Sequence, residues 1–185
     1  MFRAGLSGTN WTGKTETIKR FVKEHSKLAI KTVSLSSLVD RCPFPMRKDQ
    51  TVEGSRWMID QVRSICEQDG AEMQLFDRTP VDILAFTLYA EDREGRSNTT
   101  VLEDALELVK YFNIIFYLPV SNEWPVNWSP SKNGIQFARQ MDTYIQKAID
   151  QFSLEVVLLP WDLAERQLLL SKNMSVLKAA CKGGR

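Results

Sequence analysis

Short apolar runs alternate with longer amphipathic stretches along the chain. The runs predict strands at residues 2–7, 28–35, 72–76, 114–120 and 155–159. Apolar residues at helical spacing predict helices at residues 13–25, 51–68, 99–112 and 134–152, one that Pro80 opens, and a tail from Trp161 onward. Because strands alternate with helices, we expect an α/β fold with a five-stranded parallel sheet and helices on both faces.

The last two runs, IIFYLPV and EVVLL, are almost entirely apolar, so we expect strands 114–120 and 155–159 to be buried on both faces. The helix at 134–152 carries a predicted buried stripe of Phe137, Met141, Tyr144, Ala148 and Phe152. No repeat or low-complexity linker interrupts the pattern. We therefore expect one domain over residues 1–185, with a lid at about 121–139.

Composition narrows the chemistry. The 185 residues include 24 Lys+Arg, 23 Asp+Glu and one histidine, with a net charge of +1. Bulk charge alone therefore does not favour nucleic acid or membrane, and multi-histidine metal sites are excluded. Cys42, Cys66 and Cys181 form no CxxC pair and fit a reducing compartment. With no apolar run near the length of a membrane span, we expect a soluble cytoplasmic protein, in the host cytoplasm if it is viral.

The strongest local signal is GTNWTGKT at residues 8–15, which fits the pattern G-x-x-x-x-G-K-[ST] between a predicted strand and a predicted helix. In this pattern backbone N–H groups surround phosphate oxygens, the lysine reaches the β- and γ-phosphates, and the hydroxyl binds Mg²⁺. The predicted nucleotide-binding residues are Gly8, Thr9, Asn10, Trp11, Thr12, Gly13, Lys14 and Thr15. The alternative interpretation is a chance turn with a surface lysine.

Besides the loop, such a site needs a carboxylate at the end of a neighbouring strand, which would anchor Mg²⁺ or accept a proton. Asp77 follows the apolar run 72–76 and therefore lies at the carboxyl edge of the predicted sheet. Arg78 beside it would bind a phosphate or the transferring group. The alternative is an ordinary surface turn that caps the next helix.

These motifs resemble those of the P-loop nucleoside and nucleotide kinases. Four further segments carry the same resemblance: DRCPFPM at 40–46, QTVEGSRWMIDQ at 50–61, FDRTPVDILAF at 76–86 and PWDLAER at 160–166. The chain looks most like a phage and bacterial branch often described as an AAA-type ATP-binding domain. Thymidine and thymidylate kinases carry a similar Asp-Arg pair. The resemblance covers most of the chain and implies ATP and Mg²⁺ as cofactors, with Thr15 and Asp77 on the metal.

The resemblance also implies roles by position. Asp77 would be the general base or the metal-side carboxylate, and Arg78 would bind the transferring group. Arg41 would line the acceptor pocket, with Asp40 as a second candidate for the acid or base. The pocket walls would include Trp57, Asp82 and Phe86, although Trp57 and Phe86 also fit a core role. Arg166 would lie near the adenine and stack on it.

The lid departs from the family pattern. An arginine is expected near Gly134, but Gln136 is found there, which leaves Lys132 and Arg139 as candidate lid cations, with Arg139 as the catalytic candidate. Upstream, Trp124 and Trp128 would either pin a lid onto the domain or form an aromatic surface for bases.

The sequence thus predicts a kinase that transfers the γ-phosphoryl group of ATP to a nucleoside, a nucleotide or a related hydroxyl-bearing nucleobase derivative. One alternative is the same chemistry on a hydroxymethyl-pyrimidine within DNA, along a basic groove past Arg41, Arg47, Lys48 and the loop from Trp124 to Lys132. Another is a regulatory ATPase without an acceptor. We expect a monomer or homodimer without a membrane partner.

Overall fold

The computed structural model describes residues 1–68, 72–121 and 132–183, and the side chains of these residues except Lys132 and 176–183. The elements, in chain order, are β1 (Phe2–Ser7), α1 (Lys14–Glu24), β2 (Ile30–Ser34), α2 (Ser36–Val39), the 3₁₀ helix η1 (Arg47–Asp49), α3 (Val52–Glu67), β3 (Met73–Asp77), α4 (Pro80–Glu94), α5 (Thr99–Val109), β4 (Ile114–Tyr117), α6 (Lys132–Gln151), β5 (Val157–Leu158) and α7 (Leu163–Gly183).

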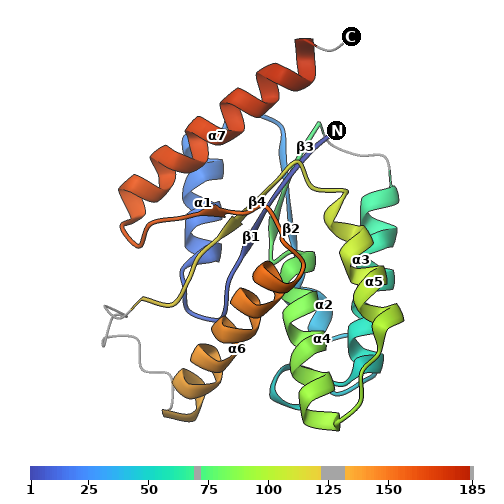
Figure 1. Cartoon of the computed structure of the whole chain (residues 1–185). Coiled ribbons are helices and arrows are strands. Elements are labelled where there is room, and N and C mark those ends of the chain that lie inside the picture. Colours follow the sequence, from blue (N-terminus) through green and yellow to red (C-terminus); the bar gives the residue numbers. More distant parts are fainter. Residues whose placement is uncertain (69–71, 122–131, 184–185) are drawn as a thin grey trace.

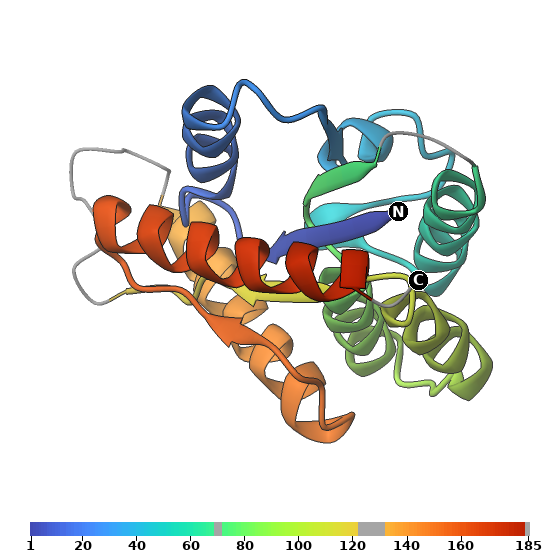
Figure 2. The ribbon, with the colours of Figure 1, turned by 90° about the horizontal axis from the view of Figure 1, so that it is seen from above.

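The strands form one five-stranded sheet in the order β2-β3-β1-β4-β5, and each neighbouring pair is parallel. Helices α1 and α7 cover one face, whereas α3, α4, α5 and α6 cover the other (Figures 1 and 2). The predicted α/β fold, a parallel sheet with helices on both faces, is therefore confirmed. Its carboxyl edge is where ligands bind in such sheets.

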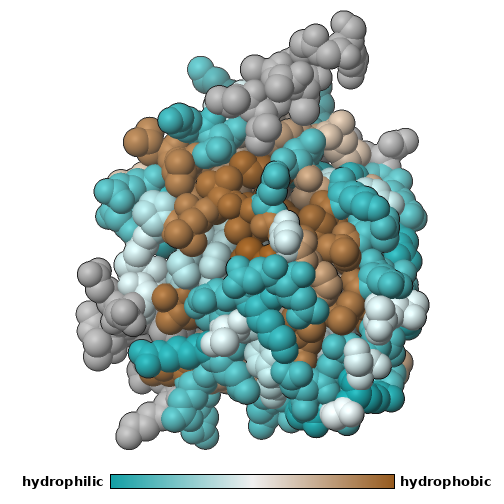
Figure 3. All heavy atoms as spheres, viewed as in Figure 1, coloured by the Kyte–Doolittle hydropathy of each residue, from teal (hydrophilic) through white to brown (hydrophobic). Residues whose placement is uncertain are grey.

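The burial of the strands follows their place in the sheet. Every residue of the two neighbouring strands β1 and β3 is buried, including the polar residues Arg3 and Gln74. At the outer edge, β5 is only two residues long, and Leu158 is 61% exposed. Only Leu159 of residues 155–159 is buried, so the expectation that this run is buried on both faces is wrong for β5, the edge strand of the sheet. Apolar atoms gather in the middle of the face drawn in Figure 3.

The buried stripe of α6 also differs from its prediction. Met141 and Ala148 are buried as predicted, but Phe137, Tyr144 and Phe152 are only half-buried. Ala138 and Ile145 occupy the buried positions instead. The aromatic rings lie at the flank, where Phe137 and Tyr144 both pack edge-on against Tyr89 of α4.

Helix capping sets the start of α4, which follows β3 directly. Thr79 accepts a hydrogen bond from the N–H of Val81, and the Asp82 side chain accepts one from the N–H of Thr79 at 2.9 Å. This reciprocal pair satisfies N–H groups that the helix itself leaves unpaired. The capping box thereby fixes the β3–α4 turn that carries Asp77 and Arg78.

Within the described ranges, no helix is both long enough and apolar enough to cross a bilayer.

Candidate nucleotide and acceptor site

The loop between β1 and α1 has the backbone geometry of a phosphate-binding loop. Gly13, the N-cap of α1, has φ of 89°, and Gly8 has φ of 146°. A Cβ at Gly8 would also lie 2.6 Å from the carbonyl oxygen of Leu118. Glycine is therefore needed at both ends of the loop, as the motif predicts. Thr9 and Thr12 are buried in the body of the loop.

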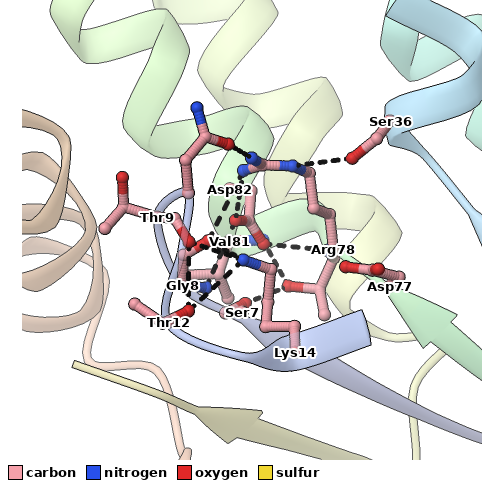
Figure 4. Close-up of polar contacts among 12 residues, drawn as sticks. Ser7, Gly8, Thr9, Thr12, Lys14, Ser36, Asp77, Arg78, Val81 and Asp82 are labelled. Carbon is pink, nitrogen blue, oxygen red and sulfur yellow. Dashed lines mark hydrogen bonds and ion pairs between the residues drawn. The ribbon is translucent and has the colours of Figure 1, made fainter. Parts of the chain in front are cut away.

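Lys14 lies across this loop, as Figure 4 shows. Its Nζ donates to the carbonyl oxygens of Gly8 and Thr9, both at 2.7 Å. Burial, followed by the nearby positive charge of Arg78, lowers the pKa of Lys14 to about 7. The ammonium group is thus held where a phosphate anion would strengthen its charged form.

Asp77 and Thr15 meet at the carboxyl edge of the sheet. Asp77 ends β3 and is 9% exposed, and the Thr15 hydroxyl donates to its Oδ2. A carboxylate and a hydroxyl at this position are hard oxygen donors, of the kind that Mg²⁺ combines with phosphate oxygens and water. The two residues therefore fit a Mg²⁺ site beside the loop.

Arg78 joins three segments of the site (Figure 4). Its guanidinium donates to Asn10 Oδ1 in the loop, to Ser36 Oγ in α2 at 3.1 Å, and to Asp82 Oδ1 in α4 at 3.2 Å. Its backbone is left-handed, with φ of 79°. This cation is consequently fixed beside both the loop and Asp77.

Asp82 is the buried anchor of the same network. Its side chain is 3% exposed, pairs with Arg78, and accepts from the N–H of Gly8 at 3.3 Å and from that of Thr79. One carboxylate thus links α4, the first glycine of the loop and the site arginine. The sequence places Asp82 in the pocket wall, and the structure gives it these positioning contacts as well.

We expect Asp82→Ala to lower the free energy of unfolding by about 3 kcal/mol, because it removes the ion-pair partner of Arg78 and leaves the buried N–H groups of Gly8 and Thr79 without their acceptor. Chemical denaturation measures the change. Asp92→Ala is the matched control, since Asp92 also pairs with a cation but is 53% exposed. Its effect should stay below about 1 kcal/mol. Equal effects in the two variants would contradict the anchoring role.

A cavity of about 670 Å³ opens from the loop toward α2, α3, α4 and α6. Its polar end is lined by Lys14, Thr15, Asp77 and Arg78 among others. Its apolar lining, here called the acceptor chamber, is formed by Val39, Met46, Met58, Ile83, Phe86 and Phe137. The size suits a drug-sized ligand.

Residues with strained backbone conformations line this cavity. Four described non-glycine residues have positive φ, and Trp11, Arg47 and Arg78 line the cavity. Such conformations cost of order 1–3 kcal/mol each and persist where surrounding contacts fix them. Around Arg47 these contacts come from Arg93, which donates to the carbonyls of Lys48, Asp49 and Gln50.

The cavity brings together some of the predicted residues and not others. Asn10, Trp11, Gly13, Asp82 and Phe86 line it with the polar group named above. Among the described residues, Asp40, Arg41 and Trp57 are not part of its lining. Asp40 is exposed and accepts from Arg47 at 2.7 Å. Trp57 borders a smaller hollow beside Phe44.

The predicted lid residues differ in where they lie in the structure. Trp124, Trp128 and the side chain of Lys132 lie outside the described residues. Gln136 and Arg139 are exposed on α6, and Arg139 is not in the cavity lining among the described residues. Phe137 lines the cavity instead. Residues two apart point to different helix faces, which accounts for the separation of Phe137 from Arg139.

Several lining residues were not assigned to the pocket from the sequence, and three of them lie close together in the chain. Met46, Arg47 and Gln50 belong to the segment between α2 and α3. Gln50 is 2% exposed, and its Nε2 donates to Ser55 Oγ at 3.1 Å. The two nearby prolines, Pro43 and Pro45, signal an irregular loop, but nothing in a loop sequence indicates which side chains face a cavity.

The pKa of Lys14 predicts a pH-dependent affinity for polyphosphate. A bound anion favours the ammonium form, so binding above pH 7 should take up a proton, and affinity should fall as pH rises from 7 to 9. At pH 8 the uptake should approach one proton, and the terminal phosphate of ATP is already ionised there. Calorimetry in two buffers of different ionisation heat measures this uptake. A binding heat independent of the buffer at pH 8 would contradict the prediction.

The sequence and the fold place the protein in a known group. A family profile described as "AAA domain" matches residues 3–166, and the chain belongs to this family. No curated protein matches the sequence. The chain also has the fold of the P-loop nucleoside and nucleotide kinases, as the sequence resemblance implies.

Solved structures share this fold at low sequence identity. Deoxyadenosine kinase from M. mycoides, with dCMP and dCDP bound, is 14% identical with a TM-score of 0.64, over 95% of this chain and 100% of that one. Thymidylate kinase from Candida albicans is 13% identical with a TM-score of 0.62, over 96% and 92%. YorR from Bacillus subtilis, in complex with phosphorylated GDP, is 15% identical with a TM-score of 0.59, over 99% of both chains.

Proposed function

We propose that the protein is a Mg²⁺-dependent kinase that transfers the γ-phosphoryl group of ATP to a nucleoside, a nucleotide or a related hydroxyl-bearing nucleobase derivative. The observation that carries this proposal is the continuity of one cavity, from Lys14 and Asp77 into the acceptor chamber. A switch ATPase, which activates only water, has no need of an apolar chamber beside the phosphates. The solved kinases of the same fold support the proposal.

On the donor side, the N–H groups of the loop and Lys14 would bind the phosphates, and Thr15 with Asp77 would hold Mg²⁺. The metal supplies charge neutralisation on the β- and γ-phosphates. The positive end of α1 faces the same anion, because α1 begins at Lys14 directly after the loop. These residues position the γ-phosphoryl group at the entrance to the acceptor chamber.

On the acceptor side, Phe86, Phe137 and Met58 would contact a flat base, which apolar and aromatic side chains bind well. Asp77 would accept the proton of an acceptor hydroxyl while that oxygen forms a bond to the γ-phosphorus. The bond from phosphorus to the bridging oxygen of ADP breaks in the same transfer. Arg78, fixed by Asn10 and Asp82, would stabilise the charge that develops.

A base within DNA is the second candidate acceptor, and the position of Arg47 favours it. Arg47 lines the cavity although its side chain is 64% exposed, and its partner Asp40 is 70% exposed. An exposed ion pair of this kind contributes little energy, so the guanidinium is available to a phosphate. Arg41 and Lys48 are exposed on the same segment. Flanking phosphates of a polymer would fit such a basic rim.

The deciding experiment incubates the protein and labelled ATP with a panel of acceptors: nucleosides, nucleoside monophosphates, and oligonucleotides with and without hydroxymethyl-pyrimidines. A labelled small product supports the first candidate, and a labelled oligonucleotide supports the second. Inorganic phosphate as the sole product would overturn the kinase proposal in favour of a regulatory ATPase. A gel shift at low salt with single- and double-stranded DNA provides an independent test, and no binding would exclude the polymer acceptor.

A further inference from the structure

Arg166, near the start of α7, is almost completely enclosed. It is 4% exposed, and its guanidinium donates to the carbonyls of Pro160 and Trp161 at 3.1 and 3.0 Å. One face of the guanidinium lies over the Trp161 ring, 5.7 Å from its centre. These contacts fix the cation between the β5–α7 turn and the first turn of α1. An arginine held in this way has no open face for a base.

The remaining donor of Arg166 reaches the phosphate-binding loop itself. Nη1 donates to the carbonyl of Thr12 at 3.3 Å and to Thr17 Oγ1 at 2.9 Å. Thr17 Oγ1 in turn donates to the carbonyl of Gly13 at 2.9 Å. The same guanidinium thus acts on the Thr12 carbonyl directly and, through Thr17 Oγ1, on the Gly13 carbonyl, which also accepts the helical N–H of Thr17 at 2.9 Å.

The direction of these carbonyls determines the direction of the neighbouring N–H groups. In a planar trans peptide, the C=O of one residue and the N–H of the next point in opposite directions, and the described chain contains no cis peptide. With the carbonyls of Thr12 and Gly13 drawn toward Arg166 and Thr17, the N–H groups of Gly13 and Lys14 point the other way. That orientation presents them to an anion in the loop.

Two further contacts support this arrangement. A Cβ at Gly13 would lie 3.0 Å from Arg166 Nη1, so the guanidinium packs directly against the glycine backbone. The next residue, Gln167, donates through Nε2 to the carbonyl of Thr17 at 2.9 Å, and it is 5% exposed. The start of α7 is therefore docked on the loop and on α1 by two adjacent, buried side chains.

We propose that Arg166 is a positioning residue that presets the peptides Thr12–Gly13 and Gly13–Lys14 for phosphate, and that it does not stack on the adenine. The inference rests on the proposed function only in taking a nucleotide polyphosphate as the ligand of the loop. It assigns to Arg166 a role in the affinity for phosphates, independent of the base. A ligand that carries the phosphates without a base therefore separates the two roles.

The test compares the binding of ATP and of inorganic tripolyphosphate to the wild-type protein and to Arg166→Ala, by calorimetry with Mg²⁺ present. We expect both dissociation constants to rise by the same factor, about 10-fold or more, as expected for the loss of hydrogen bonds to a charged group. A loss for ATP alone would overturn the proposal in favour of base stacking, and no loss for either ligand would also overturn it. Arg20→Ala is the matched control, since Arg20 is an exposed arginine on α1 whose partner is Glu24.

A second pair of measurements separates positioning from general destabilisation. Guanidinium ion at millimolar concentration should restore part of the tripolyphosphate affinity of Arg166→Ala and leave that of Arg20→Ala unchanged. If Arg166→Ala does not fold, Arg166→Lys replaces it, since lysine keeps the charge but lacks the planar fork. For Arg166→Lys, too, we expect the affinities for ATP and for tripolyphosphate to fall by the same factor. Neither readout requires phosphoryl transfer, so failure of the kinase proposal would leave this test intact.

Discussion

Lys14→Ala is expected to abolish phosphoryl transfer, with a loss of at least about 10³-fold in turnover. The Nζ of Lys14 is the buried cation of the loop and donates to the carbonyls of Gly8 and Thr9. Alanine removes the charge that would neutralise the β- and γ-phosphates. Transfer of label from ATP to the best acceptor of the panel measures the effect.

The matched control for this prediction is Lys23→Ala. Lys23 is exposed in the last turn of the same helix, so its loss removes the same charge far from the loop. We expect wild-type turnover from it. Circular dichroism of both variants checks that α1 is retained. Full activity in Lys14→Ala would refute the assignment of residues 8–15 as the phosphate site.

Asp77→Asn is expected to leave ATP binding largely intact and to lower turnover by about 10² or more. Asparagine keeps the shape and an oxygen that accepts from the Thr15 hydroxyl, but it neither takes up a proton at neutral pH nor carries a charge toward Mg²⁺. Steady-state kinetics should therefore show a fall in kcat with little change in KM for ATP.

Asp40→Asn is the comparison variant, because Asp40 was the other candidate for the acid or base. It is exposed, paired with Arg47 and outside the lining of the cavity among the described residues. We expect near-wild-type turnover from it. The reverse pattern, full activity in Asp77→Asn and a large loss in Asp40→Asn, would move the base to Asp40.

The positions of the loop and of Asp77 in the fold could be predicted from the sequence because they depend on local rules. The loop at residues 8–15 is specified by glycines that adopt positive φ between a strand and a helix. Asp77 could be placed because the carboxyl ends of parallel strands meet at one edge, so the end of an apolar run is enough to locate it. Neither inference requires knowledge of distant contacts.

The acceptor side was harder because it depends on irregular backbone. The segment between α2 and α3 has no period from which a face can be derived, and its course is set by contacts with Arg93 and Tyr89 of α4. The resemblance pointed to Arg41, whereas the structure brings Arg47 and Gln50 to the cavity. The left-handed backbone conformation of Arg47 cannot be predicted from the sequence.

Edge effects and long-range packing explain the remaining differences. The run at 155–159 is as apolar as a central strand, but only the strand order reveals that β5 is the last one. Arg166 was assigned to the adenine by its position in a motif. Its burial against Thr12 and Thr17 joins residues that are 154 and 149 positions apart, which no local pattern indicates.

That long-range contact has a consequence for folding. Because residues near opposite ends of the sequence complete one loop, local contacts alone do not suffice to shape the phosphate site, and the packing of α7 against α1 is also needed. Contacts between segments so far apart in sequence form against a large loop-closure entropy. Nucleotide that binds the completed loop then stabilises the whole native chain by mass action. ATP would in this way be a substrate and would also stabilise the packing of α7 against α1.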